Sequence, residues 1–130
     1  MSFEDLDFLY MPSDDVAADL AYFSTVLGGR LIFAIEDSGV RVAMIELTAG
    51  PPRVLLTDHL EGDRPILVYR VADLEATLVD LRSRGWTGER SLEIPPGPCH
   101  SFQTPGGQRI ALYQLTRPGV AAHFEGRRDF

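Results

Sequence analysis

Apolar and polar residues alternate over short stretches of this chain, and apolar residues also recur at helical spacing in two places. Between Asp5 and Met11, bulky apolar side chains fall on both sides of the alternation, which predicts a strand buried on both faces. Asp14 or Asp15 is then in position to cap a helix that ends at Gly28. Its apolar residues at helical spacing predict about three turns, and they are Val16, Leu20, Phe23 and Leu27.

Three further strands complete the first half of the chain. Residues 30–36 and 40–47 flank the turn sequence Asp37-Ser38-Gly39 and are predicted to form a hairpin. Residues 53–57 form another apolar run after a Gly-Pro-Pro break. The first half is therefore predicted to be a βαβββ unit.

The second half repeats this order. A strand is predicted over 66–71, a helix from its cap Asp73 to Gly85, and strands over 87–94, 98–104 and 108–114. The helix caps Asp15 and Asp73 are 58 residues apart, and the closing strands that start at Arg53 and Arg109 are 56 apart. Chance order in an unrelated α+β protein is the alternative, but the matching offsets favour a duplicated βαβββ unit.

Composition limits the size and the partners of the protein. A chain of 130 residues with 45% hydrophobic content suits one compact domain. Twelve Lys and Arg against 19 Asp and Glu give a net charge of -7, which argues against nucleic acid or an anionic membrane as partner. We expect a cytoplasmic protein, because the chain has neither a signal-like start nor a membrane-length apolar run. Cys99 is the only cysteine, which excludes an internal disulfide and a multi-thiolate zinc site.

Two segments carry a resemblance to a known family. Residues 15–23 with the following Val26-Leu27-Gly28 are similar to a "DLxxxxxFY…LG" helix, and residues 105–113 are similar to a "DPDGNxIEL" hairpin. Both motifs are typical of the glyoxalase/bleomycin-resistance/extradiol-dioxygenase superfamily, also called the vicinal oxygen chelate superfamily. The resemblance implies an α+β fold in which two βαβββ modules form an open, cup-shaped sheet with the helices outside. Module one spans about 5–58 and module two about 65–115 of a single domain over 1–130, with a C-terminal tail at 116–130.

Strand alternation sorts the side chains into a cup-facing and a helix-facing set. Ile110 and Leu112 are expected under a helix, which turns their neighbours inward, and the resemblance also points Cys99 and Ser101 inward. A single β-bulge would invert part of this assignment. The predicted ligand-binding residues are Phe8, Tyr10, Leu55, Thr57, Ile66, Val68, Arg70, Cys99, Ser101, Arg109, Ala111 and Tyr113.

The resemblance also predicts that no metal or other cofactor is bound. Metal enzymes of the superfamily hold a divalent ion with His, Gln or Glu, because such an ion needs several N or O donors. Here the four ligand positions fall on carbon-only side chains, which are Phe8, Leu55, Ile66 and Ala111. The histidines do not replace them, since His59 is expected in the inter-module linker, His100 on the opposite face from Cys99, and His123 in the tail.

Several other side chains allow two interpretations. Cys99 is expected to be a buried thiol rather than a nucleophile, and Ser101 could donate to a ligand or face solvent. Arginines 53, 70 and 109 could clamp an anion or pair with carboxylates such as Glu46 and Asp58. Phe8, Tyr10 and Tyr113 could stack on a ligand or simply pack. Trp86 is expected to plug the corner after the second helix, and Val120 and Phe124 are expected to pack on a sheet edge or a partner subunit, with the last residues disordered as the alternative.

These observations favour a metal-free protein that binds a small organic molecule, such as an antibiotic or an aromatic metabolite, and that forms a homodimer. The acidic composition favours a cationic ligand, whereas the inward arginines favour an anionic group. The first alternative is a metal-independent lyase or isomerase that uses Tyr10, Tyr113 or Cys99 as acid or base. A structural or regulatory protein with a vestigial cup is the second, and fold alone does not decide among the three.

Overall fold

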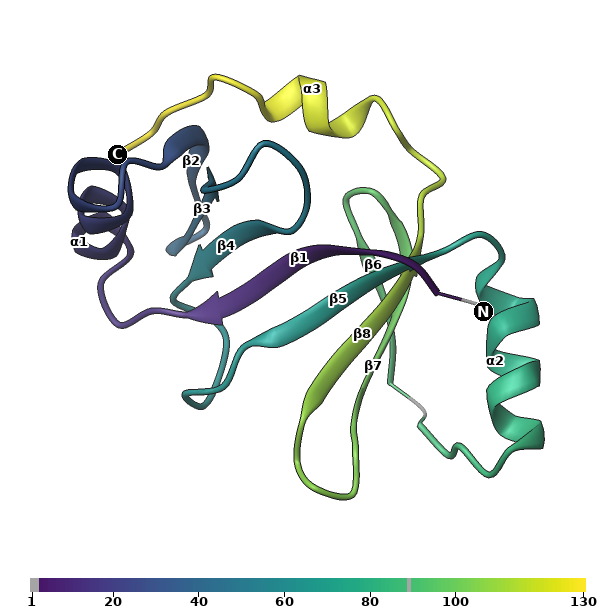
Figure 1. The fold of residues 1–130 in the computed structure, drawn as a ribbon. Helices are drawn as coiled ribbons and strands as arrows, with labels where there is room; N and C mark the ends of the chain where they lie inside the picture. The colour runs from purple at the N-terminus through teal and green to yellow at the C-terminus, as the bar shows by residue number, and fades with distance from the viewer. Residues whose placement is uncertain (1–2, 89) are drawn as a thin grey trace.

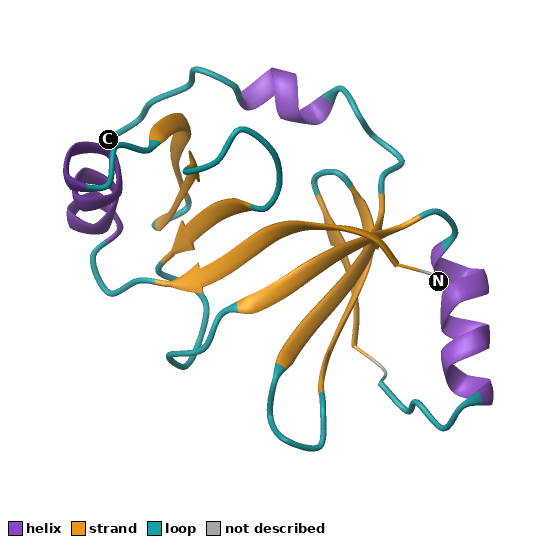
Figure 2. Ribbon diagram, in the orientation of Figure 1, coloured by secondary structure: helices purple, strands orange, loops and turns teal. Residues whose placement is uncertain are grey.

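The computed structural model describes residues 3–88 and 90–130, and its centre is one mixed, strongly curved sheet of eight strands (Figures 1 and 2). The strand order across the sheet is β2-β3-β4-β1-β5-β8-β7-β6. The strand bounds are β1 Phe3–Pro12, β2 Arg30–Asp37, β3 Val40–Glu46, β4 Arg53–Thr57, β5 Ile66–Val71, β6 Arg90–Ile94, β7 Gly97–Gln103 and β8 Arg109–Gln114.

The strand order confirms the duplicated βαβββ arrangement. In each half the first strand pairs in parallel with the fourth, β1 with β4 and β5 with β8. The two first strands, β1 and β5, then pair antiparallel at the centre and join both halves into one sheet. The cup-shaped α+β fold implied by the resemblance is therefore confirmed.

Two helices lie at opposite ends of the outer face of this sheet (Figure 1). Helix α1 (Val16–Ala21) starts at Asp15, whose carboxylate accepts the Ala18 N–H, and continues into the π-helical turn η1 (Tyr22–Val26). Helix α2 (Leu74–Ser83) starts at Asp73, whose carboxylate accepts the Ala76 N–H. Both caps match their predicted positions, because a short acceptor side chain satisfies an otherwise unpaired helix N–H.

Each helix covers its own apolar core. Under α1 the buried residues include Val16, Leu20 and Ile45. Under α2 they include Leu78 and Leu112. Trp86 packs edge-on against Phe102 at 5.4 Å between ring centroids in the α2 core, so its predicted role as a corner plug is confirmed.

Two of the predicted strand details are wrong. The strand predicted over 87–94 is described over Arg90–Ile94: residues 87 and 88 lie outside it, and residue 89 is not among the described residues. Gly88 lies close to Trp86, where an added Cβ would be 2.4 Å from the indole ring. Alternation predicts that Leu6 and Phe8 share one face, but a register shift between them places Leu6 opposite Tyr69 and Phe8 opposite Val68. Tyr69 belongs to the α2 core and Val68 to the inner face, so the bulge turns Leu6 outward.

The C-terminal tail runs along the outer edge of the sheet, beside β2. Helix α3 (Val120–Phe124) places the Phe124 ring 5.9 Å from Phe33 on the inner side of module one. The chain then follows β2, where Ala34 N–H donates to the Arg127 carbonyl and Asp129 N–H donates to the Ala34 carbonyl. The expected edge packing is confirmed for Phe124, and the last residues pair with β2. These bonds satisfy the outer edge of β2.

Candidate functional site

The inner face is the side of the sheet opposite α1 and α2, and its side chains lie in three rows that cross the central strands. The register places eleven of the twelve predicted residues in these rows, and Thr57 lies just beyond the first row beside Pro12. The first row is Leu55, Tyr10, Ile66 and Arg109; the second is Arg53, Phe8, Val68, Ala111 and Ser101; the third is Asp5, Arg70, Tyr113 and Cys99.

The centre of the inner face is apolar. Val68, Ala111, Cys99 and Tyr113 form one buried cluster, against which Phe8, Tyr10 and Ile66 pack. The four positions where the resembled family holds a metal, at Phe8, Leu55, Ile66 and Ala111, lie in adjacent rows of this centre. In the described part of the chain, no group of three or more His, Cys, Asp or Glu side chains could hold a metal ion. These residues do not fit a metal, since none of the four offers a lone pair.

The predicted residues differ in their access to solvent. Cys99, Tyr113 and Thr57 are almost completely buried, whereas Tyr10 and Ile66 are only half-buried. Burial raises the pKa of the Cys99 thiol to about 11, so Cys99 is protonated at neutral pH and is a poor nucleophile. An incoming molecule would first meet the half-buried residues among the predicted set, which are Phe8, Tyr10, Leu55, Ile66, Arg70, Ser101 and Arg109.

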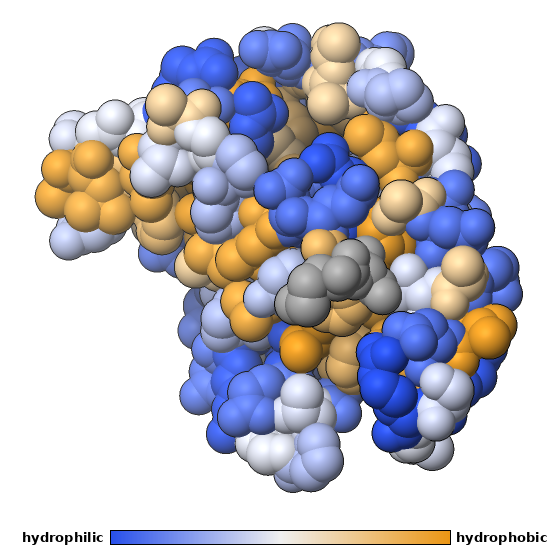
Figure 3. All heavy atoms as spheres, turned by 45° about the vertical axis from the view of Figure 1, so that its right-hand side comes forward, coloured by the Kyte–Doolittle hydropathy of each residue, from blue (hydrophilic) through white to orange (hydrophobic). Residues whose placement is uncertain are grey.

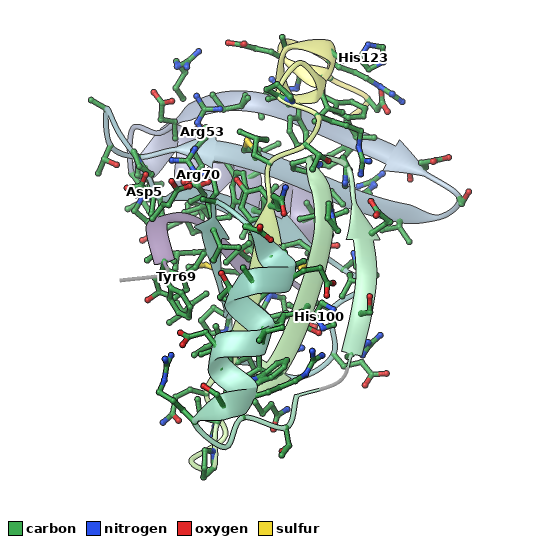
Figure 4. All side chains as sticks on the ribbon, turned by 90° about the vertical axis from the view of Figure 1, so that its right-hand side faces the viewer. Asp5, Arg53, Tyr69, Arg70, His100 and His123 are labelled. Atoms are coloured by element: carbon green, nitrogen blue, oxygen red, sulfur yellow. The ribbon has the colours of Figure 1, made fainter. Side chains whose placement is uncertain are left out.

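Two of the three inward arginines form ion pairs. Arg53 pairs with Glu46 at 3.1 Å, as the sequence allowed. Arg70 pairs with Asp5 at 2.6 Å and with Glu4 at 3.4 Å, and Figure 4 shows Asp5 and Arg70 beside each other. Of the two interpretations that the sequence allowed for these arginines, pairing with carboxylates is therefore the one that Arg53 and Arg70 follow.

Arg109 differs from the other two. Its Nη1 donates to the backbone carbonyls of Glu61 at 2.7 Å and of Arg64 at 3.0 Å. Among residues 3–88 and 90–130, no carboxylate lies within ion-pair distance of its guanidinium. One end of the inner face therefore holds a guanidinium that has no ion-pair partner among the described residues, while the end near Arg70 carries an excess of carboxylates.

A hydrogen bond between Tyr113 and Asp7 lies at the Arg70 end of the inner face. The Tyr113 hydroxyl donates to the Asp7 carboxylate, and Arg70 Nε lies 3.8 Å from the same oxygen. Burial, followed by the bond to Asp7, raises the pKa of Tyr113. Tyr113 therefore stays neutral, and its hydroxyl is held by Asp7. A neutral phenol that is already hydrogen-bonded is poorly suited to act as a general base.

A second pair lies at the Arg109 end. The Tyr10 hydroxyl forms a hydrogen bond with Nε2 of His59. The His59 backbone N–H donates to Thr57 Oγ1 at 3.4 Å, which ties the linker to the end of β4. Burial raises the pKa of Tyr10, so the phenol is neutral at ordinary pH. This pair combines a neutral phenol with an exposed imidazole beside the apolar centre.

Sequence reasoning missed Asp7 and His59. Regular alternation with Phe8 would turn Asp7 to the outer side of β1, but the bulge between Leu6 and Phe8 brings its carboxylate to Tyr113. His59 lies in the inter-module linker, as predicted, and this linker folds back over the sheet, where it contacts Tyr10. No signal in the sequence fixes either contact, because a bulge and a loop path both depend on tertiary packing.

A separate cleft of about 370 Å³ lies where β1 ends and α1 begins, beside the inter-module linker. Two of its carboxylates have partners: Asp15 caps α1, and Asp19 accepts a hydrogen bond of 2.5 Å from the buried Ser13 hydroxyl. Its lining residues are Pro12, Ser13, Asp14, Asp15, Asp19, Gly62 and Asp63.

Comparisons with known proteins identify the fold. No family model matches the sequence, and no curated protein sequence is similar to it. Solved structures do match, among them methylmalonyl-CoA epimerase from Mycobacterium tuberculosis, with a TM-score of 0.73 and 20% identity over 92% of this chain and 93% of that chain. The chain has the vicinal oxygen chelate fold.

Two further structures support this fold. A Streptomyces coelicolor methylmalonyl-CoA epimerase variant in complex with 2-nitronate-propionyl-CoA matches with a TM-score of 0.70 and 17% identity over 89% of this chain and 97% of that chain. A catechol 2,3-dioxygenase matches with a TM-score of 0.67 and 16% identity over 88% of this chain and 40% of that chain. Across the described residues, no helix has the length and apolar character that a membrane span requires.

Proposed function

We propose that this chain is a metal-free small-molecule binding protein, and that residues 1–130 act as one cytoplasmic domain. The observation that carries the proposal is the apolar centre of the inner face, where a metal enzyme with this fold would need N or O donors. Small-ligand sites usually combine apolar walls with a few polar groups. The half-buried Tyr10 and Ile66 and the polar Arg109 at one end fit that description.

The ligand that fits is a small, largely apolar or aromatic molecule. The rings of Phe8 and Tyr113, 6.0 Å apart between centroids, and the ring of Tyr10 offer faces for stacking. Because Arg53 and Arg70 are each paired with a carboxylate, Arg109 is the arginine left to orient an anionic substituent. A structural neighbour binds methylmalonyl-CoA. A polyanionic ligand of this kind would find few unpaired cationic side chains on the inner face of this protein.

We also propose that the protein is a homodimer. Apolar side chains gather on the outer surface at the α1 end of the molecule, at the left of Figure 3. Tyr22 and Val26 are one helical turn apart in η1 and are 54% and 62% exposed. An exposed apolar patch of this kind on a soluble protein is typical of a contact surface.

The experiment is a binding measurement with the neutral fluorescent probe N-phenyl-1-naphthylamine, on wild type and on Ile66→Asp. A probe at a hundred times its Kd stabilises the fold by about 2.7 kcal/mol, so fluorescence and thermal shift should agree. Ile66→Asp should abolish both signals, because it puts an unpaired carboxylate on the apolar wall. Val79→Asp on the exposed face of α2, where Val79 is 63% exposed, is the matched control. Binding that survives Ile66→Asp in folded protein would place the probe elsewhere.

A further inference from the structure

The first row of the inner face carries two different polar groups on either side of one apolar residue. Tyr10 and Arg109 are both register partners of Ile66, on β1 and β8 respectively. Strands are about 4.8 Å apart, so the Cα atoms of Tyr10 and Arg109 are roughly 10 Å apart. That span admits one small ring lying on Ile66 with a polar substituent at the edge.

The inter-module linker holds both groups in position. His59 contacts the Tyr10 hydroxyl, and the carbonyls of Glu61 and Arg64 bind Nη1 of Arg109. One short segment thus fixes a hydrogen-bonded phenol–imidazole pair and a guanidinium that no carboxylate of the described chain neutralises. The other charged groups around this end are Asp58, Glu61, Asp63 and Arg64.

We propose that this end of the inner face takes a ligand with a weakly acidic O–H group and binds it as the oxyanion. The inference rests on the proposed binding function and deepens it. The ligand O–H bond breaks and its proton moves to Tyr10 Oη, while the phenol proton of Tyr10 moves to Nε2 of His59. The ligand oxygen keeps the electron pair and faces Arg109, and the imidazolium formed at His59 is exposed and can release its proton to water.

Each group has a separate part in this step. Arg109 stabilises the oxyanion, since an opposite charge within about 4–6 Å lowers the pKa of an acid by about 1–3 units. Tyr10 passes the proton without becoming an anion, and His59 is the base. The buried Tyr113 and Cys99 cannot do this, because one is bonded to Asp7 and the other has no base beside it in the described structure.

The test uses 4-nitrophenol, whose phenol and phenolate forms absorb at different wavelengths, and its methyl ether 4-nitroanisole, which has no acidic proton. Both should bind to the full-length protein in equilibrium dialysis. Absorbance titration should show the pKa of bound 4-nitrophenol lowered by at least about one unit relative to the unbound compound. The shift should be lost in Arg109→Gln and kept in Arg109→Lys.

Tyr10→Phe and His59→Gln should each reduce the shift while 4-nitroanisole binding persists. Arg53→Gln is the matched control, because Arg53 is paired with Glu46 in the next row, and it should leave the shift unchanged. If 4-nitroanisole binds but the pKa of 4-nitrophenol is unshifted, or the shift survives Arg109→Gln, this inference is wrong while the binding function stands. If neither compound nor N-phenyl-1-naphthylamine binds, the binding function itself is wrong.

Discussion

Tyr113 donates a hydrogen bond to Asp7 across the centre of the sheet, from the last strand of module two to the first strand of module one. We expect Tyr113→Phe to lower the free energy of unfolding by about 1–3 kcal/mol, because it leaves a partly buried carboxylate without this donor. Tyr69→Phe on the α2 side, where the ring packs on Phe3 at 5.3 Å, is the control and should change little. Urea denaturation measures both.

Burial of Tyr113, together with its bond to Asp7, gives a pH dependence of stability with a definite sign. The pKa of Tyr113 is raised above its ordinary 10.0, so the folded state holds the phenol proton more tightly than the unfolded state does. This stabilisation is fully present below about pH 10 and is lost as the pH rises toward the higher folded pKa. The difference in stability between wild type and Tyr113→Phe should therefore shrink above pH 10. A constant difference up to pH 11 would contradict this reading.

Cys99 should be chemically inert in the folded protein. Its thiol is 3% exposed and its pKa is raised from 9.0 to about 11, so little thiolate exists at pH 8. We expect a thiol reagent such as 5,5′-dithiobis(2-nitrobenzoate) to label native protein at least a hundred times more slowly than urea-unfolded protein. Fast labelling of native protein would instead support a reactive, accessible cysteine.

Sequence reasoning predicted the parts of this molecule that depend on local pattern. The caps Asp15 and Asp73 and the strands 53–57 and 66–71 follow from short-range signals, and the structure has them at those positions. Alternation also correctly assigned Ala111 to the inner face and Leu112 to the face under α2, because a regular strand turns successive side chains to opposite faces.

The electrostatics of the site could not be predicted in this way. Arg53, Arg70 and Arg109 are equivalent by alternation, yet the first two form ion pairs, whereas Arg109 has no carboxylate partner in the described part of the chain. That difference depends on the path of the linker and on the bulge in β1, which bring Glu61 and Asp7 to their places. Both are properties of packing between segments distant in sequence, which single-sequence patterns do not encode.

The protein is expected to bind no divalent metal in stoichiometric amount. The reason is the chemistry of Phe8, Leu55, Ile66 and Ala111, whose side chains offer no donor atoms. Elemental analysis after dialysis should find well under one ion per chain, and added Zn²⁺ or Mn²⁺ should not raise the melting temperature. One ion per chain retained against a chelator would disprove the metal-free assignment.

Phe124 should hold the tail on the sheet. Its ring packs on Phe33 and lies in the same inner-face cluster as Met44. We expect Phe124→Ala to cost about 1–3 kcal/mol of unfolding free energy, less than a fully buried Phe, because Phe124 is only half-buried. Val79→Ala at the exposed face of α2 should cost under about 0.5 kcal/mol as a surface control. Amide exchange at Ala34, which donates to the Arg127 carbonyl, should accelerate in Phe124→Ala if the tail detaches.

The α1 patch should mediate the proposed dimer. Tyr22 and Val26 present an exposed apolar area one turn apart, and Leu27 and Leu47, 49% and 43% exposed, are further exposed apolar residues of module one. Light scattering should give twice the 14.4 kDa of one chain at micromolar concentration. Val26→Lys should shift the protein toward monomer, because it buries an unpaired charge in the interface, whereas Val79→Lys on α2 should not. Circular dichroism of both variants checks that the fold persists. A wild-type monomer would contradict the dimer itself, whereas a dimer that survives Val26→Lys would place its interface on another surface.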